Sequence, residues 1–245
     1  MKRLELLGVE GLPEVRPGDD LAELIAARAR FEAGDVLVVA QKVVSKAEGR
    51  IVELNDVTAG AEAVQIAGRL VAKPDPRMVQ VVLDESVRVL RSERVLITET
   101  RHGYVSANAG VDHSNVGGRD TLTLLPLDPD ASAARLRARL RDLAGADVGV
   151  IVSDTFGRPW RLGIVNVALG VAGLPAVIDL RGTPDDDGNP LHATVLAVAD
   201  EVAASAGLVM GKTDRTPAVI ARGLRLKGRG TGQDLIRPQA EDLFR

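Results

Sequence analysis

The sequence contains no cysteine and few aromatic residues, with three Phe, one Tyr and one Trp in 245 residues. The absence of cysteine excludes disulfides, thiolate metal sites and cysteine nucleophiles. No apolar run approaches the roughly 20 residues of a membrane span. The first residues, 1–13, also lack the apolar segment of about 7 to 15 residues that a signal peptide needs. We therefore expect a cytoplasmic protein without membrane contact, with a core of Ala, Val and Leu.

A basic excess is missing as well. The formal net charge is -3, which argues against a general nucleic-acid binder, because phosphate contacts are usually made by an excess of Lys and Arg. The most basic stretch, residues 222–230, contains no aromatic side chain on which a base could stack. This stretch is read as a solvated loop or as a contact for an anionic small molecule. No nucleic acid is expected among the partners.

The chain alternates helical and strand patterns. Its length allows a single domain over 1–245 or two packed subdomains, with a weak seam near the proline-containing stretch 123–131. Asp130 is expected to cap one helix and Gly145 to end it. The periodicity favours a parallel α/β sheet. The predicted helices cover 20–32, 57–73, 76–90, 130–144 and 193–206, and the predicted strands cover 36–40, 94–99, 147–152, 176–180 and 217–223.

The most informative stretch is 147–161, in which an apolar strand is followed by Ser153, Asp154 and Thr155. A carboxylate and a hydroxyl at a strand end offer oxygen ligands to a divalent cation, although polar strand ends are also common without a site. Asp112 and Asn115 lie in a bend rich in Gly, Asn and Ser, where they are equally usual as turn residues.

Lys46 closes an apolar region that reads as part of a strand. Its ammonium suits a bound phosphate, but a lysine that merely reaches for solvent fits the pattern equally well. His102, His113 and His192 lack a metal-binding spacing, which favours hydrogen-bonding or surface roles. Both functional readings therefore stay open on the residues alone.

Residues 206–213 match a phosphate-binding P-loop in which alanine replaces the first glycine. A true P-loop lies between a strand and a following helix, because its amides and the helix N-terminus hold the phosphates together. Here the predicted order is helix, loop, strand. A P-loop is therefore not expected, although the segment can still contact a nucleotide in another way.

Several ordered blocks of the sequence resemble the coenzyme F420-0:L-glutamate ligases, the F420:gamma-glutamyl ligase family. The resemblance covers nearly the whole chain, and the chain resembles the stand-alone form, which has no C-terminal nitroreductase-like domain. The implied fold is α+β, with two interleaved subdomains and a homodimer. The blocks are residues 11–20, 40–50, 109–116, 153–161, 179–182 and 198–206.

The resemblance implies a GTP-dependent ligase that joins L-glutamate to the lactyl carboxylate of F420-0, or of its dehydro form, and releases GDP and phosphate. A related ligase with another acceptor is the alternative. The implied cofactors are Mg²⁺ or Mn²⁺ and a monovalent cation, with GTP as co-substrate. The matching metal positions are Asp112, Asp154 and Thr155. The matching nucleotide positions are Leu12, Pro13, Glu14, Val15, Gln41, Lys46, Asn115, Met210, Gly211 and Lys212.

One position departs from the family pattern. Lys212 stands where archaeal relatives carry a glutamine that binds metal, and an ammonium group cannot coordinate a metal ion. Lys212 is expected either to remove the second metal site or to replace its charge. No residue is identified as a general base.

Overall fold

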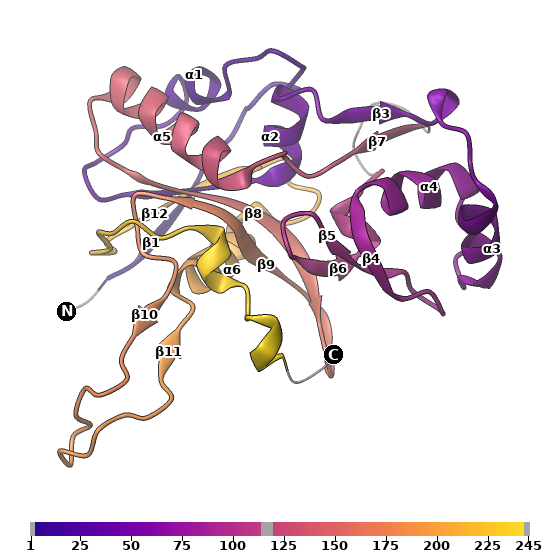
Figure 1. The fold of residues 1–245 in the computed structure, drawn as a ribbon. Coiled ribbons are helices and arrows are strands. Elements are labelled where there is room, and N and C mark those ends of the chain that lie inside the picture. The colour runs from indigo at the N-terminus through magenta and orange to yellow at the C-terminus, as the bar shows by residue number, and fades with distance from the viewer. Residues whose placement is uncertain (1–2, 114–119, 243–245) are drawn as a thin grey trace.

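The structure, a computed structural model, describes residues 3–113 and 120–242. Its centre is a five-stranded sheet in which only β2 and β8 run parallel, and every other neighbouring pair is antiparallel (Figure 1). The α+β class is confirmed, and the parallel sheet predicted from periodicity is wrong. In sheet order the strands are β1 (Glu5–Gly8), β12 (Ala218–Arg222), β2 (Val36–Ala40), β8 (Gly149–Arg158) and β9 (Arg161–Ala172).

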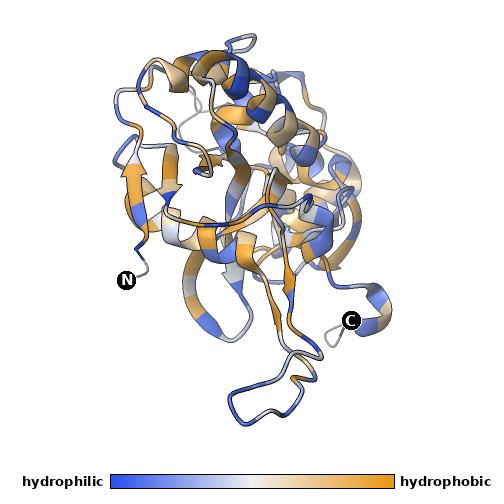
Figure 2. Cartoon of the chain, turned by 90° about the vertical axis from the view of Figure 1, so that its left-hand side faces the viewer, coloured by the Kyte–Doolittle hydropathy of each residue, from blue (hydrophilic) through white to orange (hydrophobic). Residues whose placement is uncertain are grey.

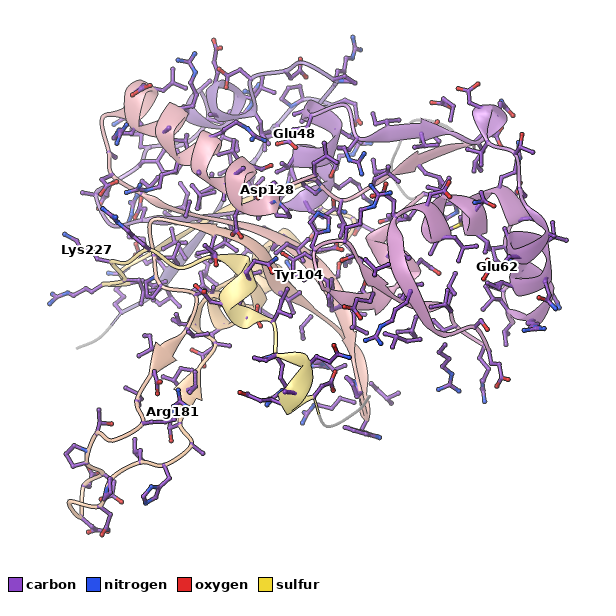
Figure 3. The ribbon with its side chains drawn as sticks, viewed as in Figure 1. Glu48, Glu62, Tyr104, Asp128, Arg181 and Lys227 are labelled. Carbon is purple, nitrogen blue, oxygen red and sulfur yellow. The ribbon has the colours of Figure 1, made fainter. Side chains whose placement is uncertain are left out.

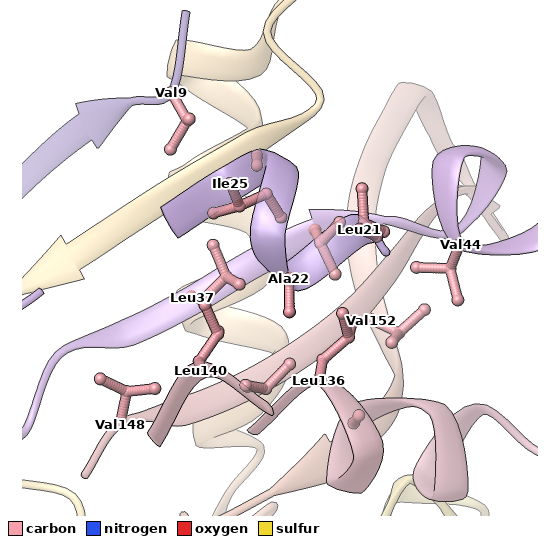
Figure 4. Close-up of a cluster of buried hydrophobic side chains, with 14 of the residues drawn as sticks. Val9, Leu21, Ala22, Ile25, Leu37, Val44, Leu136, Leu140, Val148 and Val152 are labelled. Carbon is pink, nitrogen blue, oxygen red and sulfur yellow. The ribbon is translucent and has the colours of Figure 1, made fainter. Parts of the chain in front are cut away.

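Helices cover both faces of this sheet because the side chains of its central strands alternate between two apolar layers. Leu37 and Val39 of β2 pack under α1 (Leu21–Ala26) and α5 (Pro129–Ala144) (Figure 4). The intervening valines of β2 pack toward α6 (Val198–Met210) on the opposite face. The core is aliphatic, as the composition predicts.

The caps of α5 correct one prediction. Asp128, not Asp130, accepts the capping hydrogen bond, which the backbone N–H of Ala131 donates. The Asp130 carboxylate instead accepts hydrogen bonds from the N–H groups of Val171 and Gly232, both at 2.7 Å. Asp130 therefore fastens β9 and the C-terminal segment to the helix. The predicted helix end is confirmed, because Gly145 follows α5 in the left-handed conformation.

Residues between β2 and α5 form a second apolar cluster beside the main sheet (Figure 1). The predicted helices 57–73 and 76–90 are too long, because the chain after the second helix becomes a strand. The predicted seam at 123–131 stays a prediction. The elements are α2 (Gln41–Ala47), β3 (Ile51–Glu53), η1 (Leu54–Asp56), α3 (Ala61–Arg69), α4 (Pro76–Asp84), β4 (Ser86–Arg91), β5 (Ile97–Thr100), β6 (Val105–Ala107), η2 (Asn108–Gly110) and β7 (Thr121–Thr123).

Tyr104, labelled in Figure 3, joins this second cluster to the main sheet. It precedes β6, and its buried hydroxyl donates a hydrogen bond to the carbonyl of Leu169 in β9. His102 stacks on the Tyr104 ring, and its Nε2 lies 3.0 Å from two backbone carbonyl oxygens. The scarce aromatic side chain thus fixes the position of β6 relative to β9.

A long hairpin leaves the body of the protein between β9 and α6. It consists of β10 (Ile178–Asp179) and β11 (Val195–Leu196), and its connecting loop is mainly hydrophilic (Figure 2). The predicted helix 193–206 is wrong at its start, since β11 occupies that part and α6 begins at Val198. The C-terminal segment contains the short helices η3 (Gly232–Leu235) and η4 (Gln239–Glu241). Among the described residues, no helix combines the length and the apolarity that crossing a membrane requires.

Candidate functional site

The site forms where β2 ends beside β8. The expectation that the apolar strand ends at Ser153, Asp154 and Thr155 is wrong, because β8 continues to Arg158 by pairing with β9. Its parallel partner β2, however, ends at Ala40, opposite Ser153. Asp154 and Thr155 are therefore the first residues of β8 with only one neighbouring strand. The missing neighbour leaves room for their side chains at this flank of the sheet.

Asp112 reaches the same place from the second cluster. Its backbone exchanges two hydrogen bonds with Thr123, at 3.0 and 2.8 Å, which fixes the position of its side chain. The preceding turn needs glycine at Gly110, where φ is 70° and a Cβ would lie 2.7 Å from the side chain of Leu125. Asp112, Asp154 and Thr155 all line one pocket of about 560 Å³. The structure thus brings together the three residues predicted to hold metal.

The charges at this pocket explain the titration of Asp154. The pKa of Asp154 is raised to about 6, mainly by burial and also by the negative charge of Asp112, while the hydrogen bond from the N–H of Thr155 opposes the shift. Lys212 and Lys42 also lower this pKa. An added cation would reduce the electrostatic repulsion between the Asp154 and Asp112 carboxylates and would stabilise their ionised forms.

Two lysine ammonium groups are bound to the pocket oxygens. Lys42 Nζ lies 2.7 Å from Asp112 Oδ2, and Lys212 Nζ donates to Thr155 Oγ1 at 2.5 Å. Lys42 is not among the residues predicted from the sequence, in which its only signal is its position just after the strand 36–40. Lys212 does bring a positive charge to the oxygens predicted to bind metal. A divalent ion at these oxygens would have to displace both ammonium groups.

The donor set fits a hard divalent cation. Two carboxylates and a hydroxyl provide oxygen ligands, and Mg²⁺ characteristically takes few protein ligands and completes its shell with water and phosphate. In the part of the chain that the structure describes, no group of three or more His, Cys, Asp and Glu side chains could hold a metal. The Thr155 hydroxyl would be the third protein oxygen of such a site.

Several of the predicted nucleotide positions lie on α2 or contact it, and Lys46 is one helical turn beyond Lys42. Lys46 lies on this helix, not on a strand as expected, and its buried ammonium forms an ion pair with Glu14. The segment containing Leu12, Pro13, Glu14 and Val15 is thereby held against α2. Gln41 is buried, and its Oε1 accepts a 2.8 Å hydrogen bond from Ser45. Asn115 lies outside the described residues.

The third part of the predicted nucleotide site follows α6. Met210 is buried in the core, and its sulfur accepts a hydrogen bond from Asn166 Nδ2 at 3.3 Å. Gly211 has a φ of 58°, and a Cβ there would lie 2.2 Å from Asp214 Oδ2. Only the backbone and Lys212 are therefore available to a ligand. The segment runs from helix to loop to strand, as predicted, which is not the P-loop order.

Comparison with known proteins identifies relatives over the whole chain. The profile described as F420-0:Gamma-glutamyl ligase matches residues 11–223. The coenzyme F420:L-glutamate ligase of Archaeoglobus fulgidus is 48% identical over 244 residues, covering 99% of this chain and 97% of the relative. The protein of the same name from Methanopyrus kandleri is 47% identical over 255 residues, covering 100% of both chains. That of Halobacterium salinarum is 47% identical, covering 99% and 96%.

Proposed function

The chain belongs to the F420-0:gamma-glutamyl ligase family, and from this premise we propose that it joins L-glutamate to the lactyl carboxylate of F420-0 at the expense of GTP. The carboxylate is a poor electrophile, so it first takes the γ-phosphoryl group of GTP and becomes an acyl phosphate, releasing GDP. The α-amine of glutamate then attacks the acyl carbon and displaces phosphate. Further glutamates are added in the same way through γ-linkages, and the dehydro form of F420-0 is the other acceptor.

The observation that carries this proposal is the convergence of Asp112, Asp154 and Thr155 on one pocket. These residues would hold Mg²⁺ or Mn²⁺, which supplies neutralisation of the crowded phosphate charges when bound. A divalent ion would take the place of the ammonium groups of Lys42 and Lys212. The released ammonium groups are then available to the phosphate oxygens that arrive with the nucleotide.

The nucleotide part of the proposal rests on α2 and the segment before α1. Lys46 has only 6% of its surface exposed, and a buried ammonium whose partner is a mobile carboxylate can exchange that partner for a phosphate. Glu14, the present partner, has a largely exposed side chain. Nucleotide binding would therefore turn Glu14 away from Lys46. A homodimer and a monovalent cation complete the proposed active form.

Purified protein incubated with F420-0, L-glutamate, GTP and Mg²⁺ or Mn²⁺ tests the proposal. We expect GDP release that requires both F420-0 and L-glutamate, and no release when ATP replaces GTP at equal concentration. Each substrate is omitted in turn as a control. GDP release with another carboxylate and none with F420-0 would reject the proposed acceptor and favour a related carboxylate–amine ligase. The absence of GDP release under all conditions would reject the ligase reaction itself.

A further inference from the structure

The pocket extends well beyond the proposed metal ligands. From Asp112 and Asp154 it runs along β8 to Arg158, and the opposite wall comes from β6 and from Arg91 at the end of β4. Arg158 lies four positions after Asp154 in β8, which corresponds to roughly 13 Å between their Cα atoms along a strand. Its walls are partly apolar, formed by Ile97, Val105 and Phe156. The pocket is therefore long enough for a substrate that enters from the arginine end and reacts at the carboxylate end.

Two residues of this pocket carry buried polar atoms that lack partners. Among the described residues, nothing forms a hydrogen bond with Ser106 Oγ or Arg158 Nε, although both atoms are buried. Arg158 uses Nη2 to donate to the carbonyl of Leu162 at 2.9 Å, and this contact holds the guanidinium in place. Buried donors are normally paired, because an unpaired buried donor has lost its hydrogen bonds to water without gaining a partner. Such donors in a pocket wall indicate a ligand that accepts hydrogen bonds.

The charge of the wall identifies the class of that ligand. Arg91 and Arg158 both line the pocket, with Arg158 four positions along β8 from Asp154, and among the described residues Arg91 donates a long 3.3 Å hydrogen bond to a backbone carbonyl. Guanidinium groups bind phosphate and carboxylate oxygens in pairs. The end near the two carboxylates would repel an anion unless a cation intervened. An anionic group is therefore bound most favourably at the arginine end.

The nucleotide is a poor candidate for this position. The predicted nucleotide residues Glu14 and Lys46 do not line the pocket, and Lys46 lies one turn of α2 beyond Lys42, which contacts Asp112. The carboxylates at the pocket end thus separate the proposed nucleotide side from the arginine side. In a phosphoryl transfer, the donor and the acceptor approach the transferred group from opposite sides. The arginine side consequently belongs to the acceptor.

We propose that Arg91, Arg158 and Ser106 form the acceptor subsite, which binds the phosphodiester that carries the lactyl group of F420-0. This inference rests on the function proposed above. Arg158 and Arg91 pair with the phosphodiester oxygens, and the Ser106 hydroxyl donates a further hydrogen bond. The lactyl carboxylate then points toward Asp112 and Asp154, where it is phosphorylated.

Steady-state kinetics of Arg158→Gln and Ser106→Ala test this subsite, with F420-0, GTP and L-glutamate varied separately. Loss of a charged hydrogen bond is expected to raise the KM for F420-0 about 10- to 100-fold in Arg158→Gln. Loss of the hydroxyl is expected to raise it about 2- to 10-fold in Ser106→Ala. The KM values for GTP and L-glutamate are expected to stay unchanged. Because the Ser106 hydroxyl has no partner in the free protein, Ser106→Ala is not expected to lower the melting temperature.

Arg161→Gln is the matched control, since Arg161 faces Arg158 across the same hairpin and does not line the pocket. An equal rise in this variant would attribute the effect to the charge of the hairpin and overturn the assignment. A rise confined to the KM for GTP or for L-glutamate would also overturn it, as would unchanged kinetics in both variants. Arg158→Lys, which keeps the charge but loses the fork, is expected to restore part of the affinity.

Direct binding separates this inference from the proposed reaction. The deazaflavin fluorescence of F420-0 is titrated with wild type and Arg158→Gln in the absence of GTP. If wild type binds F420-0 but forms no product, the proposed reaction fails while the subsite is still measured. Weaker binding by Arg158→Gln alone supports the subsite in either case. Equal binding by wild type and Arg158→Gln contradicts it.

Discussion

Replacing Asp154 by asparagine should stabilise the metal-free protein at neutral pH. Asp154 has an ordinary pKa of 3.8, which burial raises to about 6 in the folded protein. Between these pH values the unfolded chain has lost the proton and the folded protein retains it. The free energy of unfolding therefore falls as the pH rises from about 4 to 6, and it stays lowered above the folded pKa. Asparagine has no charge to bury, so the free energy of unfolding of the variant does not show this fall with rising pH.

The magnitude follows from the size of the shift. Each pKa unit corresponds to about 1.4 kcal/mol, so a shift of about two units makes the variant at most about 3 kcal/mol more stable at pH 7.5. Below pH 4 both proteins are neutral at this position, and the difference should vanish. Asparagine can still accept the hydrogen bond from the N–H of Thr155, so the local backbone is not expected to change.

Urea unfolding of wild type and Asp154→Asn, followed by circular dichroism in the presence of a chelator from pH 4 to pH 8, measures this difference. Asp186→Asn removes an exposed carboxyl of the hairpin loop and serves as the control. Adding Mn²⁺ should reverse the order, because wild type gains about 4.1 kcal/mol at one thousand times the dissociation constant and the variant loses this gain. A variant less stable than wild type at pH 7.5 without metal would refute the reasoning. A stability difference independent of pH would refute it equally.

Three further predictions concern residues that position the site. Asp130→Ala should lower the free energy of unfolding by about 2 to 4 kcal/mol in urea titrations, because the N–H groups of Val171 and Gly232 lose their shared acceptor. The control is Asp128→Ala, which removes a helix cap and should cost about 1 kcal/mol. A loss in Asp130→Ala no larger than in this control would contradict the prediction. Gly211→Ala should reduce ligation more than tenfold and lower the melting temperature, since the new Cβ would meet the carboxylate of Asp214; unchanged activity would show that the loop adjusts. Lys212→Met removes a positive charge that lowers the pKa of Asp154. The apparent pKa for metal binding, measured by Mn²⁺ titration at several pH values, should therefore rise. An unchanged apparent pKa would show that Lys212 does not affect the charge of Asp154.

The sequence predicts individual elements of this protein better than their partners. The prediction of a strand at 36–40 is confirmed, because its unbroken β-branched run is typical of a strand that is buried on both faces. Val43 and Val44 continue the apolar run and predict that the strand extends beyond residue 40. Both residues instead belong to α2. The sequence could not show that Asp128 caps α5 and Asp130 does not, since the two aspartates flank the same proline. The distant N–H groups that engage Asp130 are visible only in the fold.

The same limit applies to the candidate site. The strand end indicates Asp154 and Thr155 as oxygen ligands, the family resemblance adds Asp112, and the structure places all three on one pocket. Lys42 was missed because its partner Asp112 is far away in the sequence. The continuation of β8 to Arg158 was missed because it depends on pairing with β9, not on apolar periodicity. Contacts between remote segments therefore supply the part of the site that composition and spacing do not encode.

The stoichiometry of the complete reaction tests the central claim most directly. Purified protein is incubated with F420-0, L-glutamate, GTP and Mn²⁺, and the product is analysed by mass spectrometry while GDP is quantified in the same sample. We predict one GDP for every glutamyl residue added, with product formation abolished in Asp154→Asn although this variant remains folded. Glutamylated product from folded Asp154→Asn at the wild-type rate, or product formed without GDP release, would contradict the account.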